Sequence, residues 1–471
     1  MKVTQVAVCP SEASKRAGRP ALTPELLAAS GARYSRNNEG LAAILSRIDP
    51  ENLESSVDSI FKMVDYGHQS IADMVPVAMF IDGISIWLAY YLWTLCPLAG
   101  GQESSTRYLK LSVDGLIPAD QLGIPAGQTE EWTRLMTRCF QSYQTALSAW
   151  EKLSQENPTV MGIPRWLLDD ASAGAQKKVA RMRRNFAFDR ARYFLPVASA
   201  TNVMMLMSAR AWVQLCQYLL SHGLPEARRL GELVRDELAL SAPRLVKHAR
   251  RSEPHERLLE REFDAWVQRA RSTPLSEALL AEHSDQPAVP FLSVMSPPGV
   301  TASEIAQDLA CHPNRYAPVG SGLQRTSVRF GWSAVGFAEI RDLNRHRTGT
   351  KYCPQVPVGF YYALDQLGSD GAAGTGQWLR GEGAVGLGVS VRSGRLLQAA
   401  EPTYIYWSLL GAQYPFEHST TADKFLYEAE LRTGLGAHFR YARHLREALG
   451  LWYEQFPQTK GLVLEGSGEP E

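Results

Sequence analysis

The chain lacks an excess of either charge and lacks any cysteine pattern. Its 471 residues include 49 Lys and Arg and 49 Asp and Glu, so the formal net charge is zero. This balance gives no reason to expect a nucleic-acid or membrane-surface partner, and any anionic ligand must be held by a local cluster of arginines. The six cysteines are scattered, without the paired spacing of a zinc site or the density of a disulfide scaffold. We therefore expect no metal and a reducing, cytoplasmic setting.

Long apolar runs are also missing. No segment reaches roughly 18 consecutive apolar residues, the length of a membrane helix. The first ten residues lack a basic stretch followed by an apolar one, so we expect neither secretion nor membrane spanning. What the chain does contain is 45% hydrophobic residues, enough for about two or three domains with cores of their own.

Apolar spacing predicts a mixed but mostly helical architecture. Residues 74–81, rich in Val, Met and Phe, favour a strand, as do residues 326–332. Apolar residues recur with helical periodicity in eight further stretches. The predicted helices are 52–64, 84–93, 132–153, 200–221, 225–245, 334–343, 420–432 and 436–455.

A glycine-rich stretch runs from Gly368 to Gly388. Glycine at this density is typical of turns and loops because it accepts backbone conformations that other residues avoid. We therefore expect an exposed excursion here, either a lid or a strand pair with loose turns.

An internal repeat relates the two halves of the chain. Tyr66, a strand ending at Phe80 and a following helix are echoed by Tyr316, a strand ending at Phe330 and a following helix. Both tyrosines and both phenylalanines are 250 positions apart (316 − 66 and 330 − 80). A duplication with this period indicates an internal pseudo-dimer rather than a solenoid. We predict a first module at 1–250, a connection at 251–310 and a second module at 311–471.

Arg345-His346-Arg347 stands at the end of a predicted helix. Three adjacent groups that are cationic or can become so repel one another, so a compact cluster usually has an anionic partner such as a phosphate, a flavin or a carboxylate. A basic helix C-terminus favoured by the helix dipole is the alternative. Between its two arginines, His346 is expected to be neutral.

Three other elements place arginines where they could meet an anion. The loop from Gly100 to Tyr108 is led by glycines and holds Ser105 and Arg107 two residues apart. Backbone N–H groups, a hydroxyl and a guanidinium in this arrangement can surround a phosphate, although an ordinary polar turn has the same composition. Arg192 precedes an apolar segment, and Arg432 lies at a predicted helix end, where a nearby carboxylate could pair with it.

Taken together, these elements resemble the flavin-dependent thymidylate synthases. In that family one module contains Gly-His-x-Ser, a strand and helix, Arg-His-Arg, a Ser-x-Arg, an Arg-x-x-Leu-Pro and a late Leu-Arg. The resemblance covers roughly residues 20–250 and again 310–456. The matching segments are Tyr66-Gly67-His68-Gln69-Ser70, Ser105-Thr106-Arg107-Tyr108, Arg192 to Pro196, Arg345-His346-Arg347 and Leu431-Arg432.

The resemblance implies an α+β fold of two tandem modules, each with helices packed on a small, mostly antiparallel sheet. It also implies FAD as cofactor, with NADPH and methylenetetrahydrofolate as co-substrates. In the family, sites form between the subunits of a tetramer. Two fused modules would therefore form an internal pseudo-dimer, and a homodimer of this chain would be a pseudo-tetramer.

Each half departs from the family pattern where the other half keeps it. The first half has Leu95-Cys96-Pro97 where Arg-His-Arg belongs. The second has Ala317-Pro318 in place of Gly-His, and Gln355 and Pro357 in place of Ser-x-Arg. This complementary loss predicts one composite site between the halves.

The residue roles follow from the resemblance. We predict the nucleotide substrate on Glu103, Ser105, Arg107, Arg192 and Arg432. We predict the flavin on His68, Ser70, Arg210, Arg345, His346 and Arg347, with Arg345 and Arg347 as the catalytic pair.

The implied reaction is the FAD-dependent transfer of a one-carbon unit from methylenetetrahydrofolate to C5 of dUMP, giving dTMP. The cofactor supplies the difficult chemistry while the protein orients and stabilises charge. Two alternatives remain. One is a related flavoenzyme that acts on a different pyrimidine nucleotide or another substrate, and the other is a non-catalytic protein that binds flavin or nucleotide.

Overall fold

The computed structural model describes residues 1–9, 11–18, 20–35, 40–49, 52–65, 69–96, 98–107, 109–161, 163, 165–273, 287–367, 373–434 and 437–466. The chain divides into two compact units. The first contains Met1–Ser104, Asp120–Gly123 and Ala200–Phe263. The second contains Ser105–Ala119, Ile124–Ser199 and Asp264–Glu471. The units therefore do not follow the predicted boundaries 1–250, 251–310 and 311–471.

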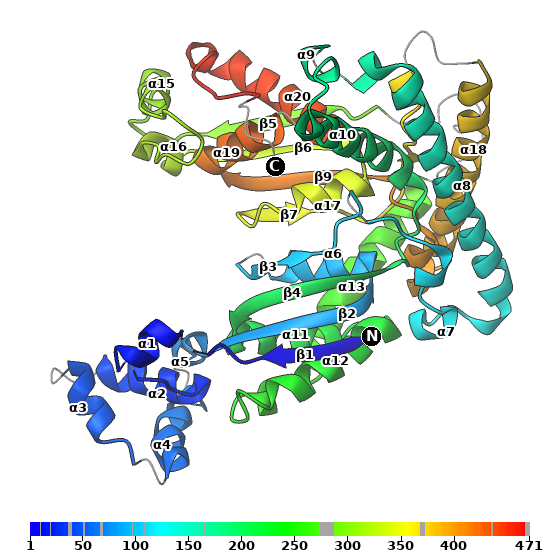
Figure 1. Ribbon diagram of the computed structural model, residues 1–471. Helices are drawn as coiled ribbons and strands as arrows, with labels where there is room; N and C mark the ends of the chain where they lie inside the picture. Colours follow the sequence, from blue (N-terminus) through cyan, green and yellow to red (C-terminus); the bar gives the residue numbers. More distant parts are fainter. Residues whose placement is uncertain are drawn as a thin grey trace. The chain divides into compact units, whose positions relative to one another are not determined.

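The first unit is built on a four-stranded antiparallel sheet with the order β1-β2-β4-β3. Its central strand β4 alternates buried and more exposed residues, and α11 and α12 pack on each other beside the sheet (Figure 1). A helical group, in which α2 contacts α3, α4 and α5, precedes β2. The strands are β1 (Lys2–Val6), β2 (Pro76–Ser85), β3 (Gly100–Glu103) and β4 (Ala200–Ser208). The helices are α1 (Glu12–Arg16), α2 (Pro24–Tyr34), α3 (Gly40–Ser46), α4 (Leu53–Asp65), α5 (Ser70–Asp73), α6 (Ile86–Leu95), α11 (Ala209–Leu220) and α12 (Pro225–Leu238). Helix α13 (Glu253–Ser272) is divided between the two units after Phe263.

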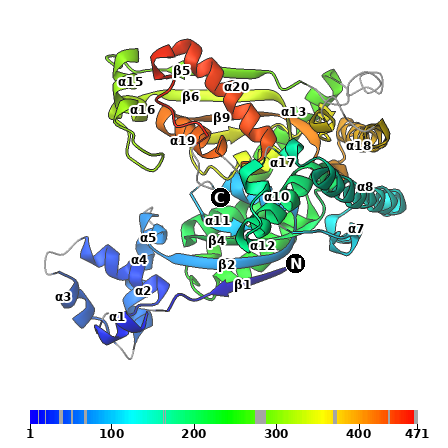
Figure 2. The same ribbon diagram turned by 45° about the horizontal axis from the view of Figure 1, so that its top comes forward.

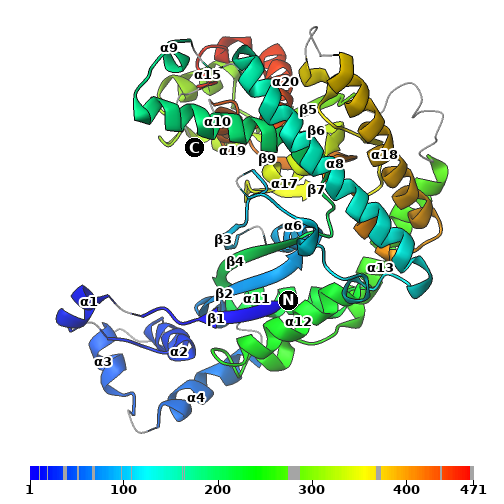
Figure 3. The same ribbon diagram turned by 45° about the vertical axis from the view of Figure 1, so that its right-hand side comes forward.

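The second unit also contains an antiparallel sheet, with the order β5-β6-β9-β7 and the short β8 paired to β9. Helix α20 packs on β5 and β6 (Figure 2), and α18 runs beside α8 (Figure 3). The strands are β5 (Pro290–Met295), β6 (Ser327–Gly336), β7 (Thr350–Tyr352), β8 (Gly359–Phe360) and β9 (Ala412–Thr421). The helices are α8 (Thr129–Glu156), α9 (Arg165–Leu168), α10 (Ala173–Ala191), α15 (Ala302–Ala310), α16 (Ser321–Arg325), α17 (Phe337–Leu343), α18 (Ala373–Gln398), α19 (Ala422–Arg432) and α20 (Phe439–Gln455), while the short α7 (Ala119–Leu122) spans the boundary.

The predicted α+β class is confirmed, since helices cover a small antiparallel sheet in each unit. The predicted strands at 74–81 and 326–332 correspond to β2 and β6, and the predicted helices at 132–153 and 420–432 to α8 and α19. Within the described part of the chain, no helix combines the length and the apolarity needed to cross a lipid bilayer.

The single helix predicted over 200–221 is wrong in its first part. Residues 200–208 form β4, which pairs with β2 on one side and β3 on the other. The helix α11 begins only at Ala209, after Ser208 caps it by accepting a hydrogen bond from the Ala211 N–H. Methionine and leucine favour helices locally, but pairing on both edges makes residues 200–208 a central strand, and this tertiary context overrides propensity.

The exposed excursion predicted for Gly368 to Gly388 is also wrong over its described part. Residues 373–398 form the long helix α18, while residues 368–372 lie outside the described residues. The glycines of this helix permit close packing. A Cβ at Gly386 would lie 2.2 Å from Cε1 of Phe360, and a Cβ at Gly383 would lie 2.4 Å from Cζ of Tyr362. Both rings are buried.

Alanine substitutions along α18 distinguish packing glycines from exposed ones. Gly386→Ala is expected to lower the free energy of unfolding by about 1–3 kcal/mol, because the buried Phe360 ring must move. Gly381→Ala, at an exposed helical site where a Cβ would meet nothing within 4 Å, is expected to raise it by about 0.5–1 kcal/mol. Denaturant unfolding measures both, and equal effects of the two substitutions would contradict this packing role.

Candidate functional site

The Arg345-His346-Arg347 triplet lies in a tight connection between α17 and β7. A bulge in β6 between Trp332 and Val335 turns the chain into α17, which ends at Leu343 with Asn344 as its C-cap. Gly349 then adopts φ 65°, and a Cβ there would lie 2.0 Å from the carbonyl oxygen of Ser419. Only glycine meets both conditions, so it closes the loop that carries the triplet.

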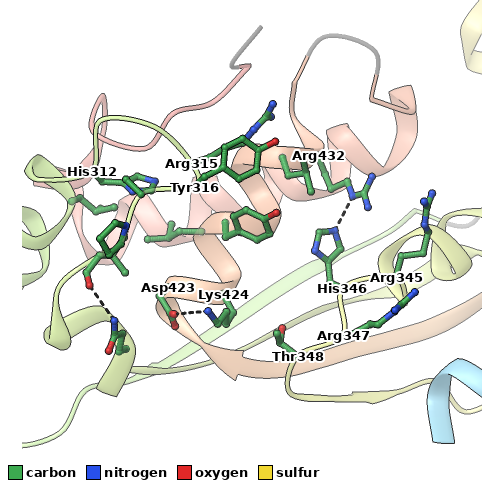
Figure 4. Close-up of a pocket in the computed structure, with 18 residues that line it drawn as sticks. His312, Arg315, Tyr316, Arg345, His346, Arg347, Thr348, Asp423, Lys424 and Arg432 are labelled. Atoms are coloured by element: carbon green, nitrogen blue, oxygen red, sulfur yellow. Dashed lines mark hydrogen bonds and ion pairs between the residues drawn. The ribbon is translucent and has the colours of Figure 1, made fainter. Parts of the chain in front are cut away.

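The triplet lines a cavity of about 530 Å³ in the second unit. Arg345, His346, Arg347 and Arg432 lie on one side of it, and His312, Arg315 and Tyr316 on the other (Figure 4). Lys424 also lines the cavity and pairs with Asp423 at 3.1 Å. The other lining residues are Leu309, Ala317, Pro318, Val319, Gln324, Thr348, Leu426, Tyr427 and Leu431. The lining thus combines a surplus of cations with apolar and aromatic side chains.

His346 is buried and accepts a hydrogen bond at its Nε2 from Nε of Arg432, at 2.7 Å. An arginine Nε–H can only donate, so Nε2 of His346 carries no proton. Burial, opposed by Glu428 and assisted by Arg432, lowers the pKa of His346 to about 3. The histidine is therefore neutral at physiological pH, in agreement with the expectation from its two arginine neighbours.

Arg107 and Arg192 have buried carboxylate partners. Arg107 binds Asp189 with both Nε and Nη2, at 2.7 and 3.0 Å. Arg192, which is 1% exposed, donates from Nη2 to Asp342 at 2.8 Å. Neither arginine lines the cavity. The carboxylates occupy positions on these guanidinium groups that an anionic ligand would otherwise take.

The two acidic residues of α17, Glu339 and Asp342, have pKa values shifted in opposite directions. Burial raises the pKa of Glu339 to about 7, even though Arg440 and Arg192 lower it. Burial would also raise the pKa of Asp342, but Arg192, Arg107 and Arg345 hold it at about 2. Asp342 therefore remains ionised and is the common electrostatic neighbour of three arginines, one of them in the triplet.

The remaining predicted site residues are not among the residues that line the cavity. Ser105 is half-buried in the second unit and accepts a hydrogen bond from the Arg107 N–H. Glu103 at the end of β3, the exposed Ser70 and Arg210, paired with Asp73 at 2.8 Å, all belong to the first unit. His68 lies outside the described residues. The assigned roles of these residues stay predictions.

The sequence patterns missed several cavity residues. Arg315, Tyr427 and Lys424 lie in segments whose polar residues carry no motif. One signal was available, because Tyr316 is the repeat partner of Tyr66, which directly precedes the Gly-His element. The residues on either side of Tyr316 line the cavity beside the triplet.

This arrangement suits a ligand that joins an anionic group to a planar ring. Guanidinium groups bind phosphates through paired N–H donors, and tyrosine rings provide flat apolar surface. A volume of about 530 Å³ falls within the range of small-molecule sites.

Comparison with known families finds a match to the first half of the chain. Residues 21–244 match the model of the family described as thymidylate synthase complementing protein. This part of the chain is therefore similar to that family, in agreement with the resemblance to the flavin-dependent thymidylate synthases. The matched residues include the Ser105 to Arg107 loop, whereas the Arg345-His346-Arg347 triplet lies beyond them.

Two individual proteins are similar to the chain. One is the UPF0159 protein Ta1429 of Thermoplasma acidophilum, 28% identical over 234 residues, which cover 46% of this chain and 47% of that protein. The chain thus spans about half the length of this curated relative. The other is the crystal structure of the UMP/dUMP methylase PolB from Streptomyces cacaoi bound with 5-Br dUMP, with 16% identity and a TM-score of 0.32, covering 52% of this chain and 93% of that one. A TM-score this low does not establish a shared fold.

The buried pair of Arg192 and Asp342 yields a stability prediction. Asp342→Asn is expected to lower the free energy of unfolding by about 3–5 kcal/mol, because the buried Arg192 keeps its charge and loses the carboxylate to which it donates. The matched control is Glu417→Gln, which removes the partner of the exposed Arg329 and is expected to cost about 1 kcal/mol or less. Denaturant unfolding of both variants tests this, and a loss for Asp342→Asn no larger than for the control would refute the argument.

The depressed pKa of His346 yields a pH prediction. Below about pH 6.5 the unfolded chain protonates this histidine, whereas the folded chain does so only near pH 3. The unfolded state therefore binds more protons in this window, and stability falls as pH decreases from about 6.5 toward 3.

His346→Gln keeps an acceptor for Arg432 and removes this titration. The loss of unfolding free energy between pH 7 and 5 should be smaller in the variant, by at most about 1.4 kcal/mol per pH unit. The other buried histidines titrate in both proteins, so the difference isolates His346. Parallel pH profiles for the two proteins would show that His346 is not held neutral.

Proposed function

We propose that the chain is a flavin-dependent methyltransferase that places a one-carbon unit on C5 of dUMP to give dTMP. The observation that carries the proposal is the cavity in which Arg345, Arg347 and Arg432 converge around a neutral His346. The match of residues 21–244 to the thymidylate synthase complementing family supports the same chemistry. Methylenetetrahydrofolate is proposed as the carbon donor and NADPH as the reductant.

The cavity residues fit FAD. Arg345, Arg347 and Arg432 offer donors for a diphosphate, and Tyr316 and Tyr427 offer flat surface for a ring system. The two tyrosine rings are tilted by 58° with centroids 6.5 Å apart. Bound FAD would supply the redox chemistry that reduces the transferred carbon.

The protein's own groups would bind and orient the substrate. Arg345 and Arg347 would stabilise negative charge that develops on the pyrimidine ring, and His346 would hold Arg432 in position through its Nε2. The nucleotide-binding roles of Glu103, Ser105, Arg107 and Arg192, and the flavin-binding roles of His68, Ser70 and Arg210, remain part of the proposal as predictions from the family pattern.

A duplicated origin, with the chain as an internal pseudo-dimer, also belongs to the proposal. The order strand, bulge, helix and short strand occurs as β2, α6 and β3 in the first unit and as β6, α17 and β7 in the second. Helices α6 and α17 begin at Ile86 and Phe337, 251 positions apart (337 − 86), one more than the repeat in the sequence. A homodimer of the chain would then correspond to the tetramer of the family.

A second candidate is a related flavoenzyme that acts on a different pyrimidine nucleotide. The observation that favours it is the neutralisation of Arg107 and Arg192 by Asp189 and Asp342. Guanidinium groups held by buried carboxylates are less available to a substrate phosphate, so the nucleotide could be bound differently from the family pattern.

Flavin titration and turnover test the proposal. The purified chain should gain flavin absorbance with FAD and convert dUMP to dTMP with methylenetetrahydrofolate and NADPH. Arg345→Ala is expected to weaken FAD binding by about tenfold or more, because one charge-assisted contact is worth about 1.5–3 kcal/mol. Arg380→Ala, on the exposed side of α18, is the matched control and should bind FAD as the wild type does.

The outcomes separate the two candidates. Retained FAD binding without dUMP turnover would favour the different substrate. A protein that never gains flavin absorbance would remove both enzymatic proposals.

A further inference from the structure

The loop that carries the triplet is held by its backbone carbonyl groups. The Lys351 ammonium donates to the carbonyl oxygens of His346 and Thr348, the latter at 3.3 Å. Nε2 of His418 also contacts the Thr348 carbonyl oxygen, at 2.7 Å. A carbonyl oxygen can only accept, so Nε2 of His418 carries a proton. Two side chains from outside the loop thus determine the path of the backbone at and after the triplet.

The two side chains lie side by side because of the strand register. Lys351 on β7 and His418 on β9 are directly paired antiparallel neighbours. Directly opposed residues project to the same face of a sheet, with their Cβ atoms about 4.5–5.5 Å apart. Their convergence on the loop therefore follows from the pairing of β7 with β9.

A third residue, Glu428 on α19, contacts His418 and interacts electrostatically with Lys351. Its Oε2 lies 3.1 Å from Nδ1 of His418, and both side chains are buried, 1% and 0% exposed. The second nitrogen of His418 thus faces a carboxylate. Burial would raise the pKa of Glu428, but the contact with His418 and the charge of Lys351 lower it below its usual range, so the carboxylate is ionised.

Glu428 also shares a helix face with Arg432. The two residues are four positions apart on α19, one helical turn, so their side chains project in the same direction. Arg432 donates to Nε2 of His346, while Glu428 interacts electrostatically with His346 and Lys351. The histidine of the triplet therefore interacts with both a cation and an anion of one helix.

We propose that Glu428 is a positioning residue for the triplet. Its carboxylate contacts His418 and attracts the Lys351 ammonium, and these two groups hold the carbonyl oxygens of the loop, so that Arg345 and Arg347 present their guanidinium groups to the cavity. Without the carboxylate, Lys351 would lose its negative neighbour and His418 its contact at Nδ1. The consequence for ligand binding rests on the proposed function, whereas the consequence for the loop does not.

The experiment compares Glu428→Gln and Lys351→Met with the wild type. Lys351→Met is included because loss of a fully buried carboxylate can prevent folding. Lys351→Arg keeps a cation at the same position and serves as the conservative variant. Glu417→Gln is the matched control, because Glu417 precedes His418 on β9, is more exposed and pairs with Arg329.

The first readout is hydrogen exchange of residues 344–352, measured without any ligand against residues 327–336 of β6. Exchange in 344–352 should be about tenfold faster in Lys351→Met and Glu428→Gln, while exchange in 327–336 stays unchanged. Lys351→Arg and Glu417→Gln should match the wild type. Unchanged exchange in 344–352, or an equal rise in both segments, would overturn the positioning role, since a general loss of stability affects both.

The second readout is the dissociation constant for FAD. Glu428→Gln and Lys351→Met should weaken binding by about tenfold or more, as loss of supporting contacts around a site commonly does. If the wild type binds FAD and both variants bind it equally well, the inference is wrong. If the wild type does not bind FAD, the proposed function fails, and the exchange measurement alone decides whether Glu428 positions the loop.

Discussion

The buried ion pair between Arg192 and Asp342 is the constraint on which the second unit depends. Its partners are 150 positions apart in the sequence. Arg192 follows α10, and Asp342 lies on α17, three residues before the triplet. Since an unpaired charge at this depth is strongly unfavourable, the end of α10 and the helix α17 must keep their relative positions. The pair thus fixes the position of α17, and the triplet follows directly after this helix.

The arginines of the second unit thereby fall into two groups. Arg107 and Arg192 are neutralised by carboxylates of the chain itself, away from the cavity lining. Arg345, Arg347 and Arg432 line the cavity, where the neutral His346 adds no charge and accepts from Arg432. Positive charge concentrated in a concave surface attracts anions, so the cavity rather than the buried pairs is where a phosphate-bearing ligand fits.

Much of the fold could be predicted from periodicity, and the failures have a common physical cause. Helices α8 and α19 were predicted from helical spacing of apolar residues, and strands β2 and β6 from short runs rich in residues that favour strands. The strand β4 was not, because its methionines favour helices locally and only pairing with β2 and β3 makes it a strand. The glycine-rich α18 was not, because its glycines serve contacts with Phe360 and Tyr362 that lie outside the local sequence.

The sequence by itself determined the resemblance to a family and the α+β class, and it singled out the Arg345-His346-Arg347 triplet, since these depend on residue identity and local spacing. Only the tertiary structure decided which of the predicted arginines share the cavity. Arg107 and Arg192 carry the same chemical group as Arg432, and no local pattern distinguishes them. Their difference lies in carboxylates brought from distant positions, Asp342 for Arg192 and Asp189 for Arg107. Pairing and burial are properties of the folded chain, and they determine whether a guanidinium group faces a ligand or a carboxylate.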